Sequence, residues 1–127
     1  MKHERLLTVT SLLTVLLLSF HLSDDVVRGF EPGGPLNLVG IFIMVVWLVG
    51  VLLLNGRLAG YIITFVGGVL APGVALIHMT GAGMVGGRIE GSTGILFWVW
   101  TMMAAGAVGL FSAVLAVMGI WSLRRRK

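Results

Sequence analysis

Four long apolar stretches dominate this sequence, and they leave almost no part of the chain suited to folding in water. The chain has 127 residues, of which 57% are hydrophobic and only 11% are charged, with a mean hydropathy of +1.05. This composition is far more apolar than that of a water-soluble domain. A helix needs about 20 apolar residues to cross a bilayer, so the length accommodates about four spans. We therefore expect an all-α integral membrane protein surrounded by lipid.

Polar breaks between the apolar stretches set the expected helix bounds. We predict a single four-helix transmembrane domain over residues 1–127, with helices at about residues 5–22, 38–54, 59–79 and 95–123. The segment Pro32-Gly33-Gly34-Pro35 cannot continue a helix, and Asn55-Gly56-Arg57 forms a turn tight enough for an antiparallel hairpin. Asn37 suits the N-cap of the second helix, and Pro72 predicts a kink or local unwinding in the third. The expected architecture is an antiparallel, up-and-down four-helix bundle.

Basic residues gather on one side of the expected bundle, at Lys2, Arg5, Arg57 and residues 124–127. By the positive-inside rule, both termini and the Arg57 turn are cytoplasmic, in a multi-pass protein of the cell membrane. The polar loops between helices 1 and 2 and between helices 3 and 4 then face outward. The first apolar run follows a short basic start, as a signal peptide does. It lacks a small-x-small cleavage pattern, so we expect it to remain as the first span.

Aromatic residues lie near the expected ends of the spans, as interfacial belts require. They are Phe97, Trp98 and Trp100 on the outer side, and Tyr61 and Trp121 on the inner side.

Several classes of function are excluded or disfavoured by composition. The chain has no cysteine, which rules out disulfides, thiolate metal sites and a cysteine nucleophile. The net charge is +4, but the basic residues do not form a stripe with interleaved aromatics, so nucleic acid is not an expected partner. The glycine-rich stretch from Thr80 to Gly87 lacks the Gly-Lys-Ser/Thr ending of a phosphate-binding loop.

The densest cluster of polar residues outside the basic ends follows the first apolar run. His21 near the end of helix 1 and His78 near the end of helix 3 are expected at the same outer depth, counting about 1.5 Å per residue. If helix 1 continues for another turn, His21 and Asp25 form an i, i+4 pair on one face, and Asp24 pairs with Arg28 in the same way. Further charges of this outer polar cluster are Arg88 and Glu90.

Two imidazoles and one carboxylate point to several possible chemistries. His21, Asp25 and His78 with an open position suit zinc or non-haem iron. The two histidines alone suit a haem, and Met79 or Met84 beside them suits copper. A histidine beside a carboxylate is also suited to relaying protons. No sequence spacing distinguishes among these cofactors, because the ligands would come from separate helices.

A purely structural interpretation of the same residues is also open. In it, His21, Asp24 and Asp25 end helix 1, pair with Arg28 and face water. His78 then stabilises the negative end of the helix 3 dipole.

Small residues repeat at four-residue spacing on helices 3 and 4, a pattern that lets helices pack closely. The positions are Gly67, Ala71 and Ala75 on one helix and Ala105, Gly109 and Ala113 on the other. We expect contacts within the bundle, with homo-oligomerisation or a larger membrane complex as the alternative.

Three functions remain open. The first expectation is a non-enzymatic accessory, assembly or interaction subunit with a polar pocket at its outer face. The alternative is a metal- or haem-binding membrane protein or enzyme that uses His21, Asp25 and His78. The third is a small transporter, since the chain is similar in size to small multidrug exporters. Those exporters need a carboxylate within the first helix, and here every acid except Glu4 is expected in or beside an outer loop.

Overall fold

The structure is a computed structural model that describes residues 2–29, 33–79 and 93–125 of the chain. The prediction of an all-helical protein is confirmed, since the described residues form four helices and no strand. The helices are α1 (Lys2–Val27), α2 (Asn37–Leu52), α3 (Leu58–Met79) and α4 (Ile95–Arg125).

Helix α1 runs past its expected end at Leu22 and continues to Val27. The polar residues that looked like the start of a loop therefore lie within the helix. The backbone amide of Arg28 donates to the carbonyl of Asp24 at 2.9 Å, which completes the last turn. The chain leaves the helix at Gly29, whose φ of +72° is a left-handed conformation that favours glycine.

Helix α2 begins without the expected cap. The N-cap position is Leu36, which makes no side-chain hydrogen bond to the helix. Asn37 is the first residue inside the helix, so the prediction that it caps α2 is wrong. Helix α3 contains Pro72 and continues past it to Met79.

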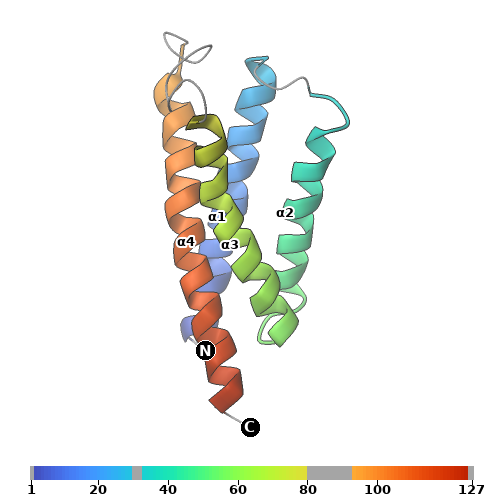
Figure 1. The fold of residues 1–127 in the computed structure, drawn as a ribbon, viewed down its shortest axis with the longest axis vertical. Coiled ribbons are helices and arrows are strands. Elements are labelled where there is room, and N and C mark those ends of the chain that lie inside the picture. The colour runs from blue at the N-terminus through green and yellow to red at the C-terminus, as the bar shows by residue number, and fades with distance from the viewer. Residues whose placement is uncertain (1, 30–32, 80–92, 126–127) are drawn as a thin grey trace.

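The chain passes along the bundle so that both termini and the turn between α2 and α3 lie at the same end (Figure 1). Helix α1 contacts each of the other three helices, and α4 packs against α1 and α3. Helix α2 contacts α1 and α3, but no described residue of α2 contacts α4. Helix α2 is therefore the most loosely held of the four.

Glycines bring α3 and α4 close together. A Cβ atom added at Gly68 would lie 2.5 Å from the carbonyl oxygen of Gly109, and one added at Gly109 would lie 2.5 Å from the Cβ of Ala71. Ala105 and Ala113 are buried, whereas Ala75 is only partly buried. Gly67 faces a different neighbour, because a Cβ there would lie 2.5 Å from the indole ring of Trp47 on α2.

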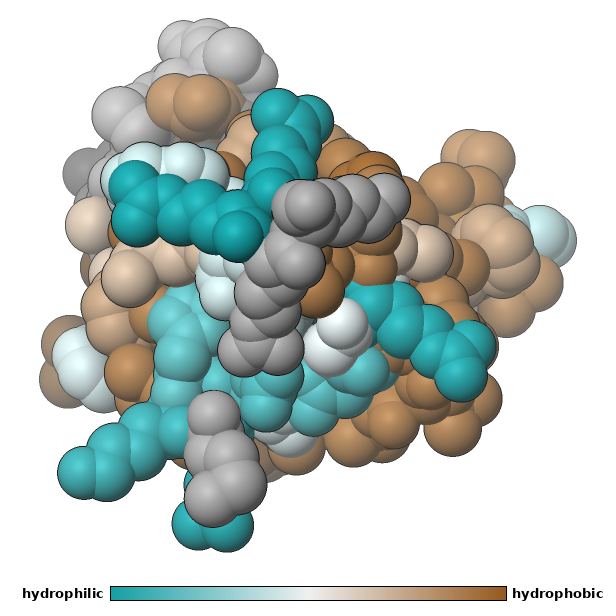
Figure 2. Space-filling model, turned by 90° about the horizontal axis from the view of Figure 1, so that it is seen from below, coloured by the Kyte–Doolittle hydropathy of each residue, from teal (hydrophilic) through white to brown (hydrophobic). Residues whose placement is uncertain are grey.

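The surface and the interior have the polarity expected in a membrane. Large apolar side chains are exposed on all four helices, whereas several polar side chains are buried. Three helices, α1, α3 and α4, are long and apolar enough to cross a membrane, and α2 is a shorter apolar helix. Hydrophilic surface gathers at the end that carries both termini (Figure 2). These helices indicate a membrane protein.

Two aromatic residues do not lie where the sequence placed them. Tyr61 and Trp98, expected in interfacial belts, are buried in the bundle at 4% and 0% exposure. Tyr61 packs with Leu7 and Leu115, on the face where Gly119 leaves room for its ring. Trp100 and Trp121 are exposed, as belt residues are.

Candidate metal centre

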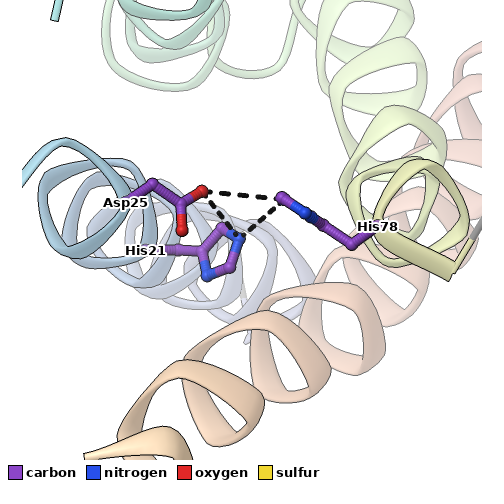
Figure 3. Close-up of side chains that lie close together, drawn as sticks. All are labelled: His21, Asp25 and His78. Atoms are coloured by element: carbon purple, nitrogen blue, oxygen red, sulfur yellow. Dashed lines mark hydrogen bonds and ion pairs between the residues drawn. The ribbon is translucent and has the colours of Figure 1, made fainter. Parts of the chain in front are cut away.

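His21, Asp25 and His78 meet inside the bundle at the end opposite the termini (Figure 3). His21 and Asp25 are one helical turn apart on α1, and both face His78 on α3. The Nε2 atoms of the two histidines are 3.3 Å apart. The Oδ2 atom of Asp25 lies 3.5 Å from Nε2 of His21 and 3.6 Å from Nε2 of His78.

Two of these side chains are buried and the third is partly buried. His21 and Asp25 are each 3% exposed, and the side chain of His78 is 22% exposed. The structural interpretation in which His21 and Asp25 face water is therefore wrong. Its premise fails because α1 continues as a helix to Val27, so the i, i+4 pair faces the interior. The predicted end of helix 1 at about residue 22 is therefore wrong, whereas Asp24 does pair with Arg28 as that interpretation expected.

Trp98 on α4 holds the carboxylate of Asp25. Its indole N–H donates to Oδ1 at 2.5 Å, which leaves Oδ2 directed at the imidazoles. The Trp98 ring also packs against both histidines, with ring centroids 5.1 Å from His21 and 5.0 Å from His78. From the sequence, Trp98 was predicted only as an interfacial aromatic residue and not as part of this centre. The available signal was its position at the outer end of the fourth apolar run, at the depth of the histidines, but depth does not reveal which face a residue occupies.

The spacing of the three atoms matches the ligand shell of a tetrahedral metal ion. A tetrahedral ion equidistant from atoms with these separations lies about 2.1 Å from each, within the lengths of zinc–nitrogen and zinc–oxygen bonds, about 2.0–2.2 Å. At such bond lengths, ligand atoms on tetrahedral zinc are about 3.3–3.4 Å apart, whereas cis ligands of an octahedral ion are about 2.9 Å apart. The observed distances agree with the tetrahedral arrangement.

The relative position of the imidazole rings supports the same arrangement. Their centroids are 5.2 Å apart, and the ring planes are at 86°. A ring nitrogen lies about 1.1 Å from the ring centre, so two rings that bind zinc from tetrahedral positions have centroids about 5.2 Å apart. The rings thus diverge from a shared point next to Asp25.

A bis-histidine haem does not fit this geometry. Trans ligands of one metal ion lie about 4 Å apart, twice a metal–nitrogen bond length, and the macrocycle must pass between them. The two Nε2 atoms here are 3.3 Å apart, and Asp25 lies beside both. Of the methionines suggested for copper, Met84 and the side chain of Met79 lie outside the described part of the structure.

A cavity of about 460 Å³ lies beside the three side chains, between α1, α2 and α3. His21, Asp25 and His78 belong to its wall, and most of its other lining residues are apolar. A ligand in the cavity would therefore have access to the point that the three residues surround.

Asp24 and Arg28, two further residues of the predicted outer cluster, pair with each other and not with this centre. The guanidinium of Arg28 donates to the carboxylate of Asp24 at 2.7 Å and to the backbone carbonyl of Thr93. The hydrogen bond to Thr93 connects the end of α1 to the start of α4. Arg88 and Glu90 lie outside the described residues.

The chain was also compared with known proteins. No protein-family model, curated protein or solved structure matches the chain.

Proposed function

We propose that this chain is a membrane protein that binds one divalent transition-metal ion through His21, Asp25 and His78, with zinc as the first candidate. The observation that carries the proposal is the triangle formed by the two Nε2 atoms and Oδ2 of Asp25. Its sides of 3.3, 3.5 and 3.6 Å fit tetrahedral zinc. Two imidazoles and one carboxylate are also the ligand types found in catalytic zinc sites.

The neighbourhood of the triangle supports the proposal. Ligating carboxylates are commonly held by a second hydrogen bond, and Trp98 supplies one to Asp25. Three protein ligands leave a fourth position open, which is typical of catalytic rather than structural zinc. A metal ion in such a site can polarise a bound carbonyl or activate a bound water. The cavity next to the histidines gives a bound molecule access to that position.

We propose that all four helices cross the membrane in an up-and-down topology, as one domain. Helix α2 has 16 residues and is about 24 Å long, somewhat less than the roughly 30 Å of hydrocarbon. Leu36 before it and Leu53 and Leu54 after it extend its apolar length. Thinning of the bilayer or a smaller tilt accommodates the remaining mismatch.

We propose that both termini and the Arg57 turn lie on the cytoplasmic side of the cell membrane. The support is the positive-inside rule, together with the hydrophilic end seen in Figure 2. The metal centre then lies near the outer face.

The first experiment is metal analysis of the detergent-purified chain, followed by titration with cobalt(II), whose tetrahedral complexes have intense visible bands. We expect about one metal ion per chain. Asp25→Asn should lower metal affinity by more than about a hundredfold, because losing even an outer-shell partner costs about 10–100-fold. Asp24→Asn is the matched control, since Asp24 is adjacent in sequence and bonds Arg28 instead.

Equal affinities of the two variants, or no tetrahedral cobalt spectrum from the wild-type chain, would contradict the proposal. In that case an accessory or interaction role, the first expectation from the sequence, becomes the leading function. The small-residue contacts that motivated it are made between helices of the same chain, as at Gly68 and Gly109. They give no separate indication of a partner.

A further inference from the structure

The cavity beside the metal centre is polar at one end and apolar along the rest of its length. His21, Asp25 and His78 lie at the polar end, with Asn37 at the start of α2. The wall on α3 extends from His78 back to Gly67, a distance of about 16 Å along the helix. Leucine, isoleucine, valine and methionine side chains make up most of the remaining wall, as at Leu18, Ile43 and Val74. An elongated molecule with one polar end complements this shape.

The volume of the cavity suits a single hydrocarbon chain. At about 460 Å³ the cavity is in the range of small-molecule sites, about 300–1,000 Å³, and is too small for a lipid with two long chains. Glycines help to open it. A Cβ at Gly73 would meet nothing within 4 Å, and one at Gly40 would have only Leu22 at 3.8 Å. The absence of contact between described residues of α2 and α4 leaves α2 free to form one wall.

Polar atoms without partners accompany this cavity. Nδ1 of His21, Oδ1 of Asn37 and Nε1 of Trp47 are buried and make no hydrogen bond among the described residues. All three residues belong to the cavity wall. Buried polar groups are normally hydrogen-bonded, and each exception calls for an explanation such as a ligand or an ordered water. Of the two groups at the polar end, the N–H at Nδ1 of His21 can donate to an anionic head group, whereas Oδ1 of Asn37 is an acceptor and needs a donor such as an ordered water.

We propose that the cavity binds a single-chain anionic amphiphile, a long-chain fatty acid, whose carboxylate occupies the open position on the metal. The inference rests on the proposed metal site. A divalent ion held by two neutral imidazoles and the Asp25 carboxylate keeps one net positive charge, which complements an anionic head group. Without the ion, the buried carboxylate of Asp25 repels that head group. Binding of the fatty acid therefore requires the metal.

The test uses the full chain in phosphatidylcholine nanodiscs, with palmitate carrying an NMR-active carbon at its carboxyl group or at its terminal methyl group. Cobalt(II) in the site shifts and broadens only nearby nuclei. We expect a strong effect on the carboxyl resonance and little effect on the terminal methyl resonance. The zinc-loaded protein, which is diamagnetic, provides the reference spectrum.

Gly40→Phe fills the cavity without touching the metal ligands, and Val39→Phe is its control. Val39 is adjacent in sequence but 58% exposed, so a larger ring there points away from the cavity. The visible cobalt bands report whether each variant retains its fold and its site. We expect loss of the effect on the carboxyl resonance in Gly40→Phe and its retention in Val39→Phe.

Each failure has its own signature. Cobalt bands with an unperturbed carboxyl resonance would overturn the fatty-acid proposal and leave the metal site standing. A carboxyl effect that persists in Gly40→Phe would show that the head group reaches the metal without its chain in the cavity, which also overturns it. Absence of the cobalt bands from the wild-type protein would remove the proposed function and this inference together.

Discussion

The contact between α3 and α4 and the outer half of α2, beside the cavity, use small residues in opposite ways. Across α3 and α4, Gly68 and Gly109 let the backbones approach so closely that even one added Cβ collides with the opposite helix. Beside the outer half of α2, Gly40 and Gly73 border the cavity and leave room for an added Cβ. The inner half of α2 is packed closely, since a Cβ at Gly50 would lie 2.6 Å from Ile63 of α3. Small residues therefore serve two purposes in one bundle. They let helices approach closely at the α3–α4 contact, and they leave room for a cavity beside the outer half of α2.

The polar centre follows the same division. Its four side chains, His21, Asp25, His78 and Trp98, come from α1, α3 and α4. Helix α2 contributes none of them, but it does contribute one wall of the cavity. The metal-binding geometry is thus fixed by the closely packed helices, whereas access to it depends on the loosely held one. Metal ligands must be held rigidly by the elements that carry them. A bound molecule needs a part of the structure that can move to admit it.

The largest expected effect comes from enlarging a glycine in the closed interface. Gly68→Leu should lower the free energy of unfolding by about 3 kcal/mol, the upper end of the usual cost of overpacking. The reason is that the first added carbon already lies 2.5 Å from the backbone oxygen of Gly109. Thermal unfolding in detergent, followed by circular dichroism, measures the change.

Gly73→Leu on the same helix is the matched variant. Because nothing lies within 4 Å of its added Cβ, we expect stability to stay within about 1 kcal/mol of wild type. Similar losses in both variants would show that the two sides of α3 do not differ in packing as described.

A smaller effect is expected at the support of the centre. Trp98→Phe keeps an aromatic ring against the histidines but removes the N–H that donates to Asp25. We expect zinc affinity to fall by about 10–100-fold, the usual cost of losing a second-shell hydrogen bond. Competition with a chelating dye measures it. Trp100→Phe, on the exposed face of the same helix, should leave the affinity unchanged.

Equal affinities in Trp98→Phe and wild type would mean that Asp25 keeps its position without the indole. The positions of the metal ligands would then be set by α1 and α3 alone, without a contribution from α4.

The number of helices follows from the sequence because apolar runs of about 20 residues have one stable outcome in lipid. The depth of His21 and His78 was likewise open to a count of residues along two helices. The depth of a residue in the membrane, however, depends only on its position along its own helix. The face that a residue occupies depends on how helices pack, so Trp98 looked like an interfacial residue although it is fully buried. The metal role of the three residues stays a prediction.

The end of α1 was harder to predict for a local reason. Ser23, Asp24 and Asp25 are typical of loops and caps, which suggested an end at Leu22. In the structure the helix continues, since Asp24 and Arg28 form an i, i+4 pair and no helix-breaking residue occurs before Gly29. One further turn decides whether Asp25 points at His21 or lies in a loop. A small error in a helix end therefore changes the candidate site completely.

The smallest effect is expected at Asp24, and it separates ligation from simple charge. Asp24→Asn removes the ion pair with Arg28, whose hydrogen bond to Thr93 remains. Unfolding free energy should fall by about 0.5 kcal/mol, as for other i, i+4 pairs. Zinc affinity should stay near that of wild type, because Asp24 holds no position in the triangle. If Asp24→Asn weakened zinc binding as much as Asp25→Asn does, the two acids would act through their shared negative field. A loss that is confined to Asp25 and exceeds about a hundredfold indicates direct coordination, since the two charges are neighbours on one helix and differ mainly in what their oxygen atoms face.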